Sequence, residues 1–247
     1  MKRKLEICCY SAESAILAEN AGADRIELCD NFSEGGTTPS CATIKYAIEK
    51  LKIPVNVIIR PRGGDFLYSK IEFEIMKQEV LEMTKLGVNG IVFGILKSNG
   101  EIDVNRTKEI MEIAPTLEHT FHRAFDMCKN HIYSLETLKK LGINRVLTSG
   151  GKNNAYDGID ILSKLVEAAE NEIIIMPGSG INENTICEIL QMTGASEFHS
   201  STKTFINSTM NYFNPDIKMG KANNIDEYMN VSVNTEQIKK MKKILNK

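Results

Sequence analysis

The sequence lacks several features that would identify common protein classes. No C-x-x-C pair occurs among its six cysteines, so the usual signature of a zinc knuckle or dithiol redox site is missing. No G-x-G-x-x-G follows the first predicted strand, which disfavours a dinucleotide-binding fold. No stretch approaches the ~18 apolar residues of a membrane span. The lack of such a stretch argues against a membrane, and the net charge of only -2 argues against nucleic acid as a partner.

The remaining composition is that of an ordinary globular protein. The chain has 247 residues, of which 42% are hydrophobic and 25% charged, which is ample for one core. Its basic start, residues 1–4, runs into Leu5, Glu6 and Ile7 without the apolar segment of a signal peptide. We therefore expect a cytoplasmic protein whose cysteines are reduced and mostly buried. A homodimer is compatible with this composition.

Short β-type runs alternate with helical patterns throughout the chain. The clearest helix is predicted over 69–86, where apolar residues recur at helical spacing. Four sequence segments resemble one another, and each combines a helix end, a glycine turn and a buried strand. Their glycines stand at positions 22, 87, 142 and 194. Strands are predicted at 5–9, 25–29, 54–60, 90–93, 117–122, 145–148, 173–176 and 196–199.

Eight β–α units in this length predict an α/β fold, a single (β/α)8 TIM barrel that takes up residues 1–247 as one domain. The segment 204–234 is Asn-rich and is expected to be irregular. An amphipathic helix over 235–245 is then expected to close the ring of helices.

Polar residues share one side of several predicted strands. Because side chains alternate along a strand and the helix-facing side must be apolar, the polar side is expected to point into the barrel. Buried charges need partners, and Glu6 and Glu27 are expected to pair with Arg60, Arg62 or Arg123. The C-terminal ends of barrel strands form binding sites, so a site is predicted there. Its predicted lining is Glu6, Cys8, Glu27, Cys29, Arg60, His122 and His199.

Glycine-rich loops add an argument for an anionic ligand. Gly178 and Gly180 allow backbone N–H groups to approach a ligand ahead of a helix. Ser200 and Ser201 follow the eighth strand, where barrels often hold a phosphate. Together with the arginines of segment 60–62, they favour an anion at the barrel mouth.

These motifs together resemble the CutC family of cytoplasmic copper homeostasis proteins. The resemblance covers about residues 4–205, whereas residues 206–247 are longer and more divergent. It rests on segments 5–11 (LEICCYS), 25–29 (RIELC), 60–66 (RPRGGDF), 120–128 (TFHRAFDMC), 145–150 (RVLTSG) and 198–201 (FHSS). The resemblance implies a TIM barrel and copper(I) binding. Its available soft ligands are Cys8, Cys9, Cys29 and Cys128.

Two function hypotheses follow. In the first, the chain binds copper(I) through Cys8 and Cys29, which share the inward side of adjacent strands. In the second, it is an enzyme that transfers protons on a small anionic metabolite, which carries a phosphate in one version of the hypothesis. The candidate catalytic residues are then His122, Glu27 and Glu6. The candidate ligand-binding residues are Arg60, Arg62, Arg123, Gly178, Gly180, His199, Ser200 and Ser201. A non-catalytic scaffold is disfavoured, since an interaction surface does not require charges inside a barrel.

Overall fold

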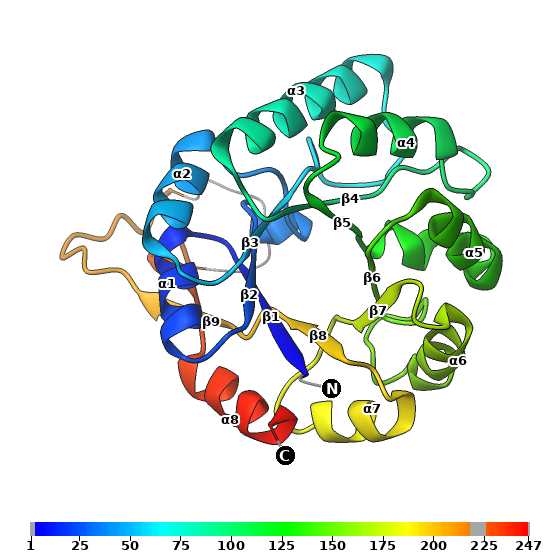
Figure 1. Cartoon of the computed structure of the whole chain (residues 1–247). Helices are drawn as coiled ribbons and strands as arrows, with labels where there is room; N and C mark the ends of the chain where they lie inside the picture. Colours follow the sequence, from blue (N-terminus) through cyan, green and yellow to red (C-terminus); the bar gives the residue numbers. More distant parts are fainter. Residues whose placement is uncertain (1–2, 218–225, 247) are drawn as a thin grey trace.

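Eight parallel strands alternate with helices to form a barrel (Figure 1). The computed structural model describes residues 3–217 and 226–246. The strands are β1 (Lys4–Cys9), β2 (Arg25–Leu28), β3 (Val55–Ile58), β4 (Gly90–Phe93), β5 (Glu118–Phe121), β6 (Arg145–Thr148), β7 (Ile174–Pro177) and β8 (Glu197–Ser200). The helices around them are α1 (Ala12–Asn20), α2 (Cys41–Lys50), α3 (Lys70–Leu86), α4 (Val104–Ile113), α5 (His131–Leu141), α6 (Ile159–Ala169), α7 (Ile186–Thr193) and α8 (Thr235–Leu245).

The hydrogen-bonded strand order is β7-β6-β5-β4-β3-β2-β1-β8, and β7 and β8 lie side by side where the ring closes. The predicted TIM barrel is thus confirmed, and each predicted strand lies on an observed one. The helix predicted over 69–86 is α3. Its N-terminus has a capping box between Ser69 and Glu72, and it ends at Gly87 with φ of 76°. Positive φ favours glycine, so Gly87 explains the stop.

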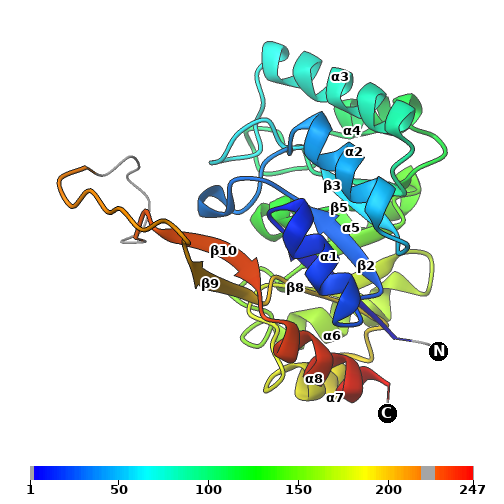
Figure 2. The ribbon, with the colours of Figure 1, turned by 90° about the vertical axis from the view of Figure 1, so that its left-hand side faces the viewer.

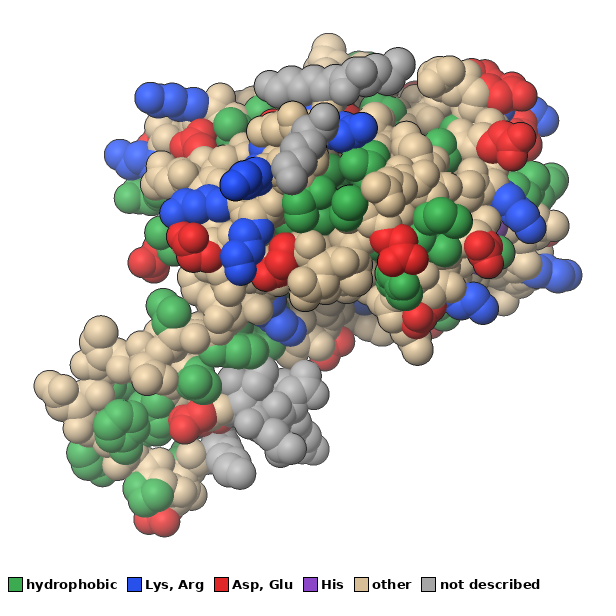
Figure 3. Space-filling view, turned by 90° about the horizontal axis from the view of Figure 1, so that it is seen from below, with side chains coloured by type: hydrophobic (Ala, Val, Ile, Leu, Met, Phe, Trp, Pro, Cys, Tyr) green, Lys and Arg blue, Asp and Glu red, His purple; other side chains and the backbone are tan. Residues whose placement is uncertain are grey.

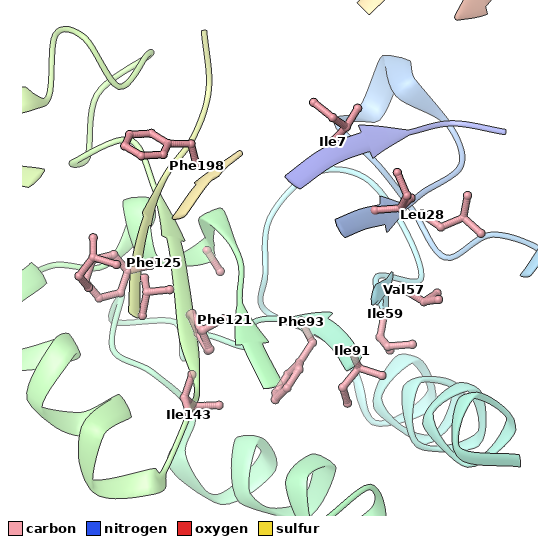
Figure 4. Close-up of a cluster of buried hydrophobic side chains, with 14 of the residues drawn as sticks. Ile7, Leu28, Val57, Ile59, Ile91, Phe93, Phe121, Phe125, Ile143 and Phe198 are labelled. Atoms are coloured by element: carbon pink, nitrogen blue, oxygen red, sulfur yellow. The ribbon is translucent and has the colours of Figure 1, made fainter. Parts of the chain in front are cut away.

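The apolar side of each strand faces the helices. Figure 4 shows Ile7, Leu28, Val57, Ile91 and Phe121 in the layer between strands and helices. All five are fully buried or nearly so. Burial of such a side chain contributes about 1.5–3 kcal/mol relative to exposure, so this layer fixes which side of every strand points inward.

The segment predicted as irregular contains a two-stranded antiparallel ribbon, which corrects that prediction. It consists of β9 (Lys203–Asn207) and β10 (Met229–Val233). The ribbon projects from the barrel (Figures 2 and 3). The chain then returns to α8, which lies between α1 and α7 and closes the ring of helices as expected. Among the helices of the described residues, none combines the length and apolar character needed to cross a bilayer.

Candidate functional site

A buried charge network occupies the barrel interior below the site. Glu197 accepts hydrogen bonds from Arg25 Nη2 and Arg145 Nε, each at 2.6 Å. Arg25 also donates to Glu6, and all four side chains are at least 95% buried. The expectation that Glu6 and Glu27 pair with Arg60, Arg62 or Arg123 is therefore wrong, since Glu6 pairs with Arg25 and His199, and Glu27 lies beside His199. Alternation along a strand predicts which side chains point inward. Which residue such a side chain pairs with depends on how far along the barrel axis each of them lies.

Above this network, Cys8, Cys29, Glu27 and His199 meet at the C-terminal ends of β1, β2 and β8. The Sγ atoms of Cys8 and Cys29 lie 3.5 Å apart. His199 Nδ1 lies 2.8 Å from Glu6 Oε1, and its Nε2 lies 3.5 Å from Glu27 Oε2. One ligand atom from each of Cys8, Glu27 and His199 falls within 4.8 Å of the others. One thiol, a carboxyl group and an imidazole are thus within reach of one ion, and the thiol of Cys29 lies beside that of Cys8.

The pKa values of the two thiols are shifted in opposite directions. The hydrogen bond with Cys29 lowers the pKa of Cys8 to about 5 against the effect of burial, and His199 lowers it further. Burial raises the pKa of Cys29, as does the neighbouring Cys8 thiolate. Burial would lower the pKa of His199, but its hydrogen bonds to Cys8 and Glu6 raise it well above the ordinary value. These shifts favour a Cys8 thiolate beside a protonated His199.

The two carboxyl groups also differ. Burial alone would raise the pKa of Glu6, but the charge of Arg25 and the hydrogen bond from His199 hold it well below its usual range. Burial raises the pKa of Glu27, and the Cys8 thiolate adds to this effect. Glu6 is therefore an ionised partner of His199, while Glu27 retains a proton more readily.

His122 and Arg60 form a second polar group, beside the ring of Phe66. Arg60 Nη1 donates to the carbonyls of Glu34 and Gly36 at 2.6 and 2.8 Å. Arg60 Nη2 donates to the carbonyl of Gly64 at 3.0 Å. His122 Nδ1 accepts from the backbone N–H of Ala124 at 3.2 Å. A neutral imidazole that accepts at Nδ1 carries its proton on Nε2, so His122 presents an N–H donor.

A cavity of about 570 Å³ joins these groups at the barrel mouth. The lining includes most of the predicted site residues, namely Cys8, Glu27, Arg60, Arg123, His122, Gly180, His199, Ser200 and Ser201. Glu6 and Cys29 are buried and contact the lining residues His199 and Cys8. These residues therefore line or contact one cavity at the C-terminal ends of the strands, where the site was predicted.

Some predicted ligand residues are engaged elsewhere. Arg62 is 36% exposed and pairs with Glu72 and Asp65, away from the cavity lining. Arg123 lines the cavity but its Nε donates to Asp126 at 2.7 Å. Gly178 packs against Leu147 and His199, so close that a Cβ there would lie 2.3 Å from Leu147 Cδ1. Its role is packing beneath the site.

Sequence reasoning missed several residues at the site. Tyr10, Phe66 and Lys203 line the cavity from loops or from the ribbon, where no alternation indicates direction. Arg145 could have been found, because an arginine that begins a four-residue buried strand must have a buried acidic partner. That partner is Glu197.

The environment of His122 predicts a measurable pH dependence of stability. Burial, with the nearby charge of Arg60, lowers the pKa of His122 from 6.5 to about 3. Below pH 6.5 the unfolded chain therefore takes up a proton that the folded chain does not. This term should lower the free energy of unfolding by about 2 kcal/mol between pH 6.5 and pH 5.

Denaturant unfolding at pH 7 and pH 5 checks this expectation against His122→Gln, which has no titrating group at this position. The wild type should lose about 2 kcal/mol more than the variant on acidification. Equal losses in the two proteins would show that His122 titrates normally.

Known proteins match the chain over most of its length. The model of the CutC family matches residues 3–204. A CutC family protein of Photorhabdus laumondii is 44% identical over 242 residues, which are 98% of this chain and 97% of that protein. The human copper homeostasis protein cutC homolog is 45% identical over 224 residues, 91% of this chain and 82% of its own.

A crystal structure supports the same assignment. The CutC protein of Streptococcus agalactiae superposes with a TM-score of 0.77 at 35% identity, and the match covers 81% of this chain and 98% of that one. With the fold, the family model and these relatives in agreement, this chain belongs to the CutC family.

Proposed function

We propose that this chain is a copper homeostasis protein that binds one copper(I) ion at the barrel mouth, with Cys8 and Cys29 as thiolate ligands and His199 as an imidazole ligand. The observation that carries the proposal is the 3.5 Å separation of the Cys8 and Cys29 Sγ atoms, with a nitrogen of His199 within 4.8 Å of Cys8 Sγ. Thiolates select copper(I) over the harder divalent ions, and an imidazole nitrogen also suits copper.

The surroundings of His199 fit the role of a metal ligand. Metal-binding histidines commonly donate their other ring N–H to a carboxylate, which fixes the ring and its tautomer. Glu6 stands in that position at Nδ1, and Arg25 holds Glu6 in place from below. Nε2 then faces Cys8 and Glu27.

The proton balance of binding follows from the same contacts. The lowered pKa of Cys8 favours its thiolate, while the raised pKa values of Cys29 and His199 favour protons that a bound ion would displace. Metal binding that releases protons strengthens as pH rises. Copper(I) affinity is therefore expected to increase with pH.

An anaerobic copper(I) titration against a competing chelator tests the proposal. The exposed thiols Cys41 and Cys187 are first replaced by serine, because they could bind copper without forming a site. We expect this variant to bind one equivalent of copper(I) in competition with the chelator. Failure to compete, with the protein still folded by circular dichroism, would contradict the proposed function.

A further inference from the structure

Glu27 is a buried acidic residue that the copper(I) proposal does not use as a ligand. Its side chain lines the cavity at the barrel mouth, and the residue is 3% exposed. Among the ion pairs of the described residues it takes part in one, in which its Oε2 lies 3.5 Å from His199 Nε2. That imidazole is shared, because its Nδ1 already pairs with Glu6. Buried carboxylates are paired with a cation or coordinate a metal ion, so Glu27 is a candidate metal ligand.

Three different donor atoms lie together at this place. The Sγ of Cys8, a carboxylate oxygen of Glu27 and a ring nitrogen of His199 are all within 4.8 Å of one another. In a tetrahedral zinc site, bonds of about 2.0–2.3 Å place such donors about 3.3–3.8 Å apart. The nitrogen and the oxygen, at 3.5 Å, are already at that separation. A shift of about 1 Å is enough to bring the sulfur to the same separation.

The three donors are held on neighbouring strands of the barrel. Cys8 on β1 is the register partner of Glu27 on β2, and His199 on β8 is the register partner of Glu6 on β1. Strands position ligands more precisely than loops do. Glu6 also fixes the ring of His199 from Nδ1, as carboxylates do for histidines that bind metals. The arrangement therefore exists before an ion binds.

The mixture of donors selects the ion. Copper(I) is selected by soft sulfur donors, whereas carboxylate oxygen suits harder ions. Zinc is bound in proteins by thiolate, imidazole and carboxylate alike. Three protein ligands leave one of its four positions open, as in catalytic zinc sites, whereas structural sites take four protein ligands. All three ligands line the cavity of about 570 Å³, so the open position borders space for water or a small molecule.

We propose that the barrel mouth also binds a divalent cation, with zinc as the fitting ion, through Cys8, Glu27 and His199, and that the fourth position is open to the cavity. Zinc and copper(I) share Cys8 and His199, so the two ions exclude each other. Zinc uses the carboxylate of Glu27 where copper(I) uses the thiolate of Cys29. The inference does not depend on copper(I) binding, because its test uses protein free of copper.

A zinc titration against a chromophoric chelator tests this proposal, in the variant whose exposed Cys41 and Cys187 are replaced by serine. We expect one equivalent of zinc to bind in competition with the chelator. Glu27→Gln keeps the size of the side chain but removes the carboxylate, and it should weaken zinc binding about 100-fold or more. The same change should weaken copper(I) binding less than about tenfold, because Glu27 is not a proposed copper(I) ligand.

Glu79→Gln is the matched control, because Glu79 is a partly buried acidic residue outside the cavity lining whose carboxylate accepts a hydrogen bond from Thr38. Its zinc affinity should equal that of the background protein. Failure of the background protein to compete for zinc, or an unchanged zinc affinity in a folded Glu27→Gln, would overturn the proposal.

Cobalt(II) provides a spectroscopic test that does not require Glu27→Gln to fold, because it takes the geometry of zinc and absorbs visible light. In the background protein we expect the intense visible bands of tetrahedral cobalt(II) and a thiolate-to-metal charge-transfer band that Cys8→Ser removes. Azide, a small anion that binds metal ions, should shift the visible bands through the open position. A cobalt(II) spectrum without a thiolate band, or one that azide leaves unshifted, would contradict the assigned site.

Discussion

Replacement of Glu197 by alanine is expected to lower the free energy of unfolding by about 3–5 kcal/mol. Glu197 is 4% exposed and bridges two arginines that are nearly fully buried. Without it, Arg145 keeps only the hydroxyl of Thr120 and the half-exposed Glu118, at 3.0 and 3.1 Å. The large cost arises because a buried charge is left with too little compensation.

Chemical denaturation at pH 7 measures this cost. Glu101→Ala is the matched control, because Glu101 pairs with Lys97 at 3.9 Å where both side chains are well exposed. Removal of that pair should cost between 0 and about 1 kcal/mol. Similar losses for the two variants would show that the buried network does not stabilise the barrel.

Replacement of Cys8 or Cys29 by serine is expected to lower copper(I) affinity at least about 100-fold. Loss of a residue that hydrogen-bonds to a metal ligand commonly lowers metal affinity 10–100-fold. Loss of a thiolate ligand itself should lower it at least as much. The hydroxyl of serine is a harder donor, and it is not ionised near neutral pH, so it replaces the thiolate poorly. The affinity is measured by the competition titration, with each change made in the variant whose Cys41 and Cys187 are replaced by serine.

Cys128→Ser is the control for loss of a buried thiol outside the site. The thiol of Cys128 donates a hydrogen bond to the carbonyl of Ala124 at 3.6 Å. Its copper(I) affinity should equal that of the background protein. If instead Cys128→Ser weakens binding while Cys8→Ser and Cys29→Ser leave it unchanged, the ligand assignment is wrong.

Much of the fold was predictable because its signals are local. Leu5 and Ile7 alternate with Glu6 and Cys8, so the inward side of β1 could be read directly from the sequence. The positive φ of Gly22, Gly87, Gly142 and Gly194 agrees with the helix ends expected there. The same alternation indicated that Glu27 and His199 point inward, and both line the cavity.

The remainder depends on contacts between distant residues. Glu197 and Arg25 are 172 positions apart, and only the strand register brings them together. The donor character of His122 depends on a backbone N–H two residues later in a 3-10 turn, which alternation does not reveal. The ribbon of β9 and β10 was missed because five of its ten residues are exposed and only Ser232 and Val233 are buried, so it contributes little to the core.

X-ray absorption spectroscopy of the copper(I)-loaded protein tests the central claim most directly. The Cys41→Ser, Cys187→Ser variant should be used at one equivalent of copper(I), so that only the proposed site contributes. We expect two sulfur scatterers at about 2.3 Å, the usual length of a metal–thiolate bond, and one imidazole nitrogen. A first shell of nitrogen and oxygen without sulfur would contradict the assignment of Cys8 and Cys29 as copper(I) ligands.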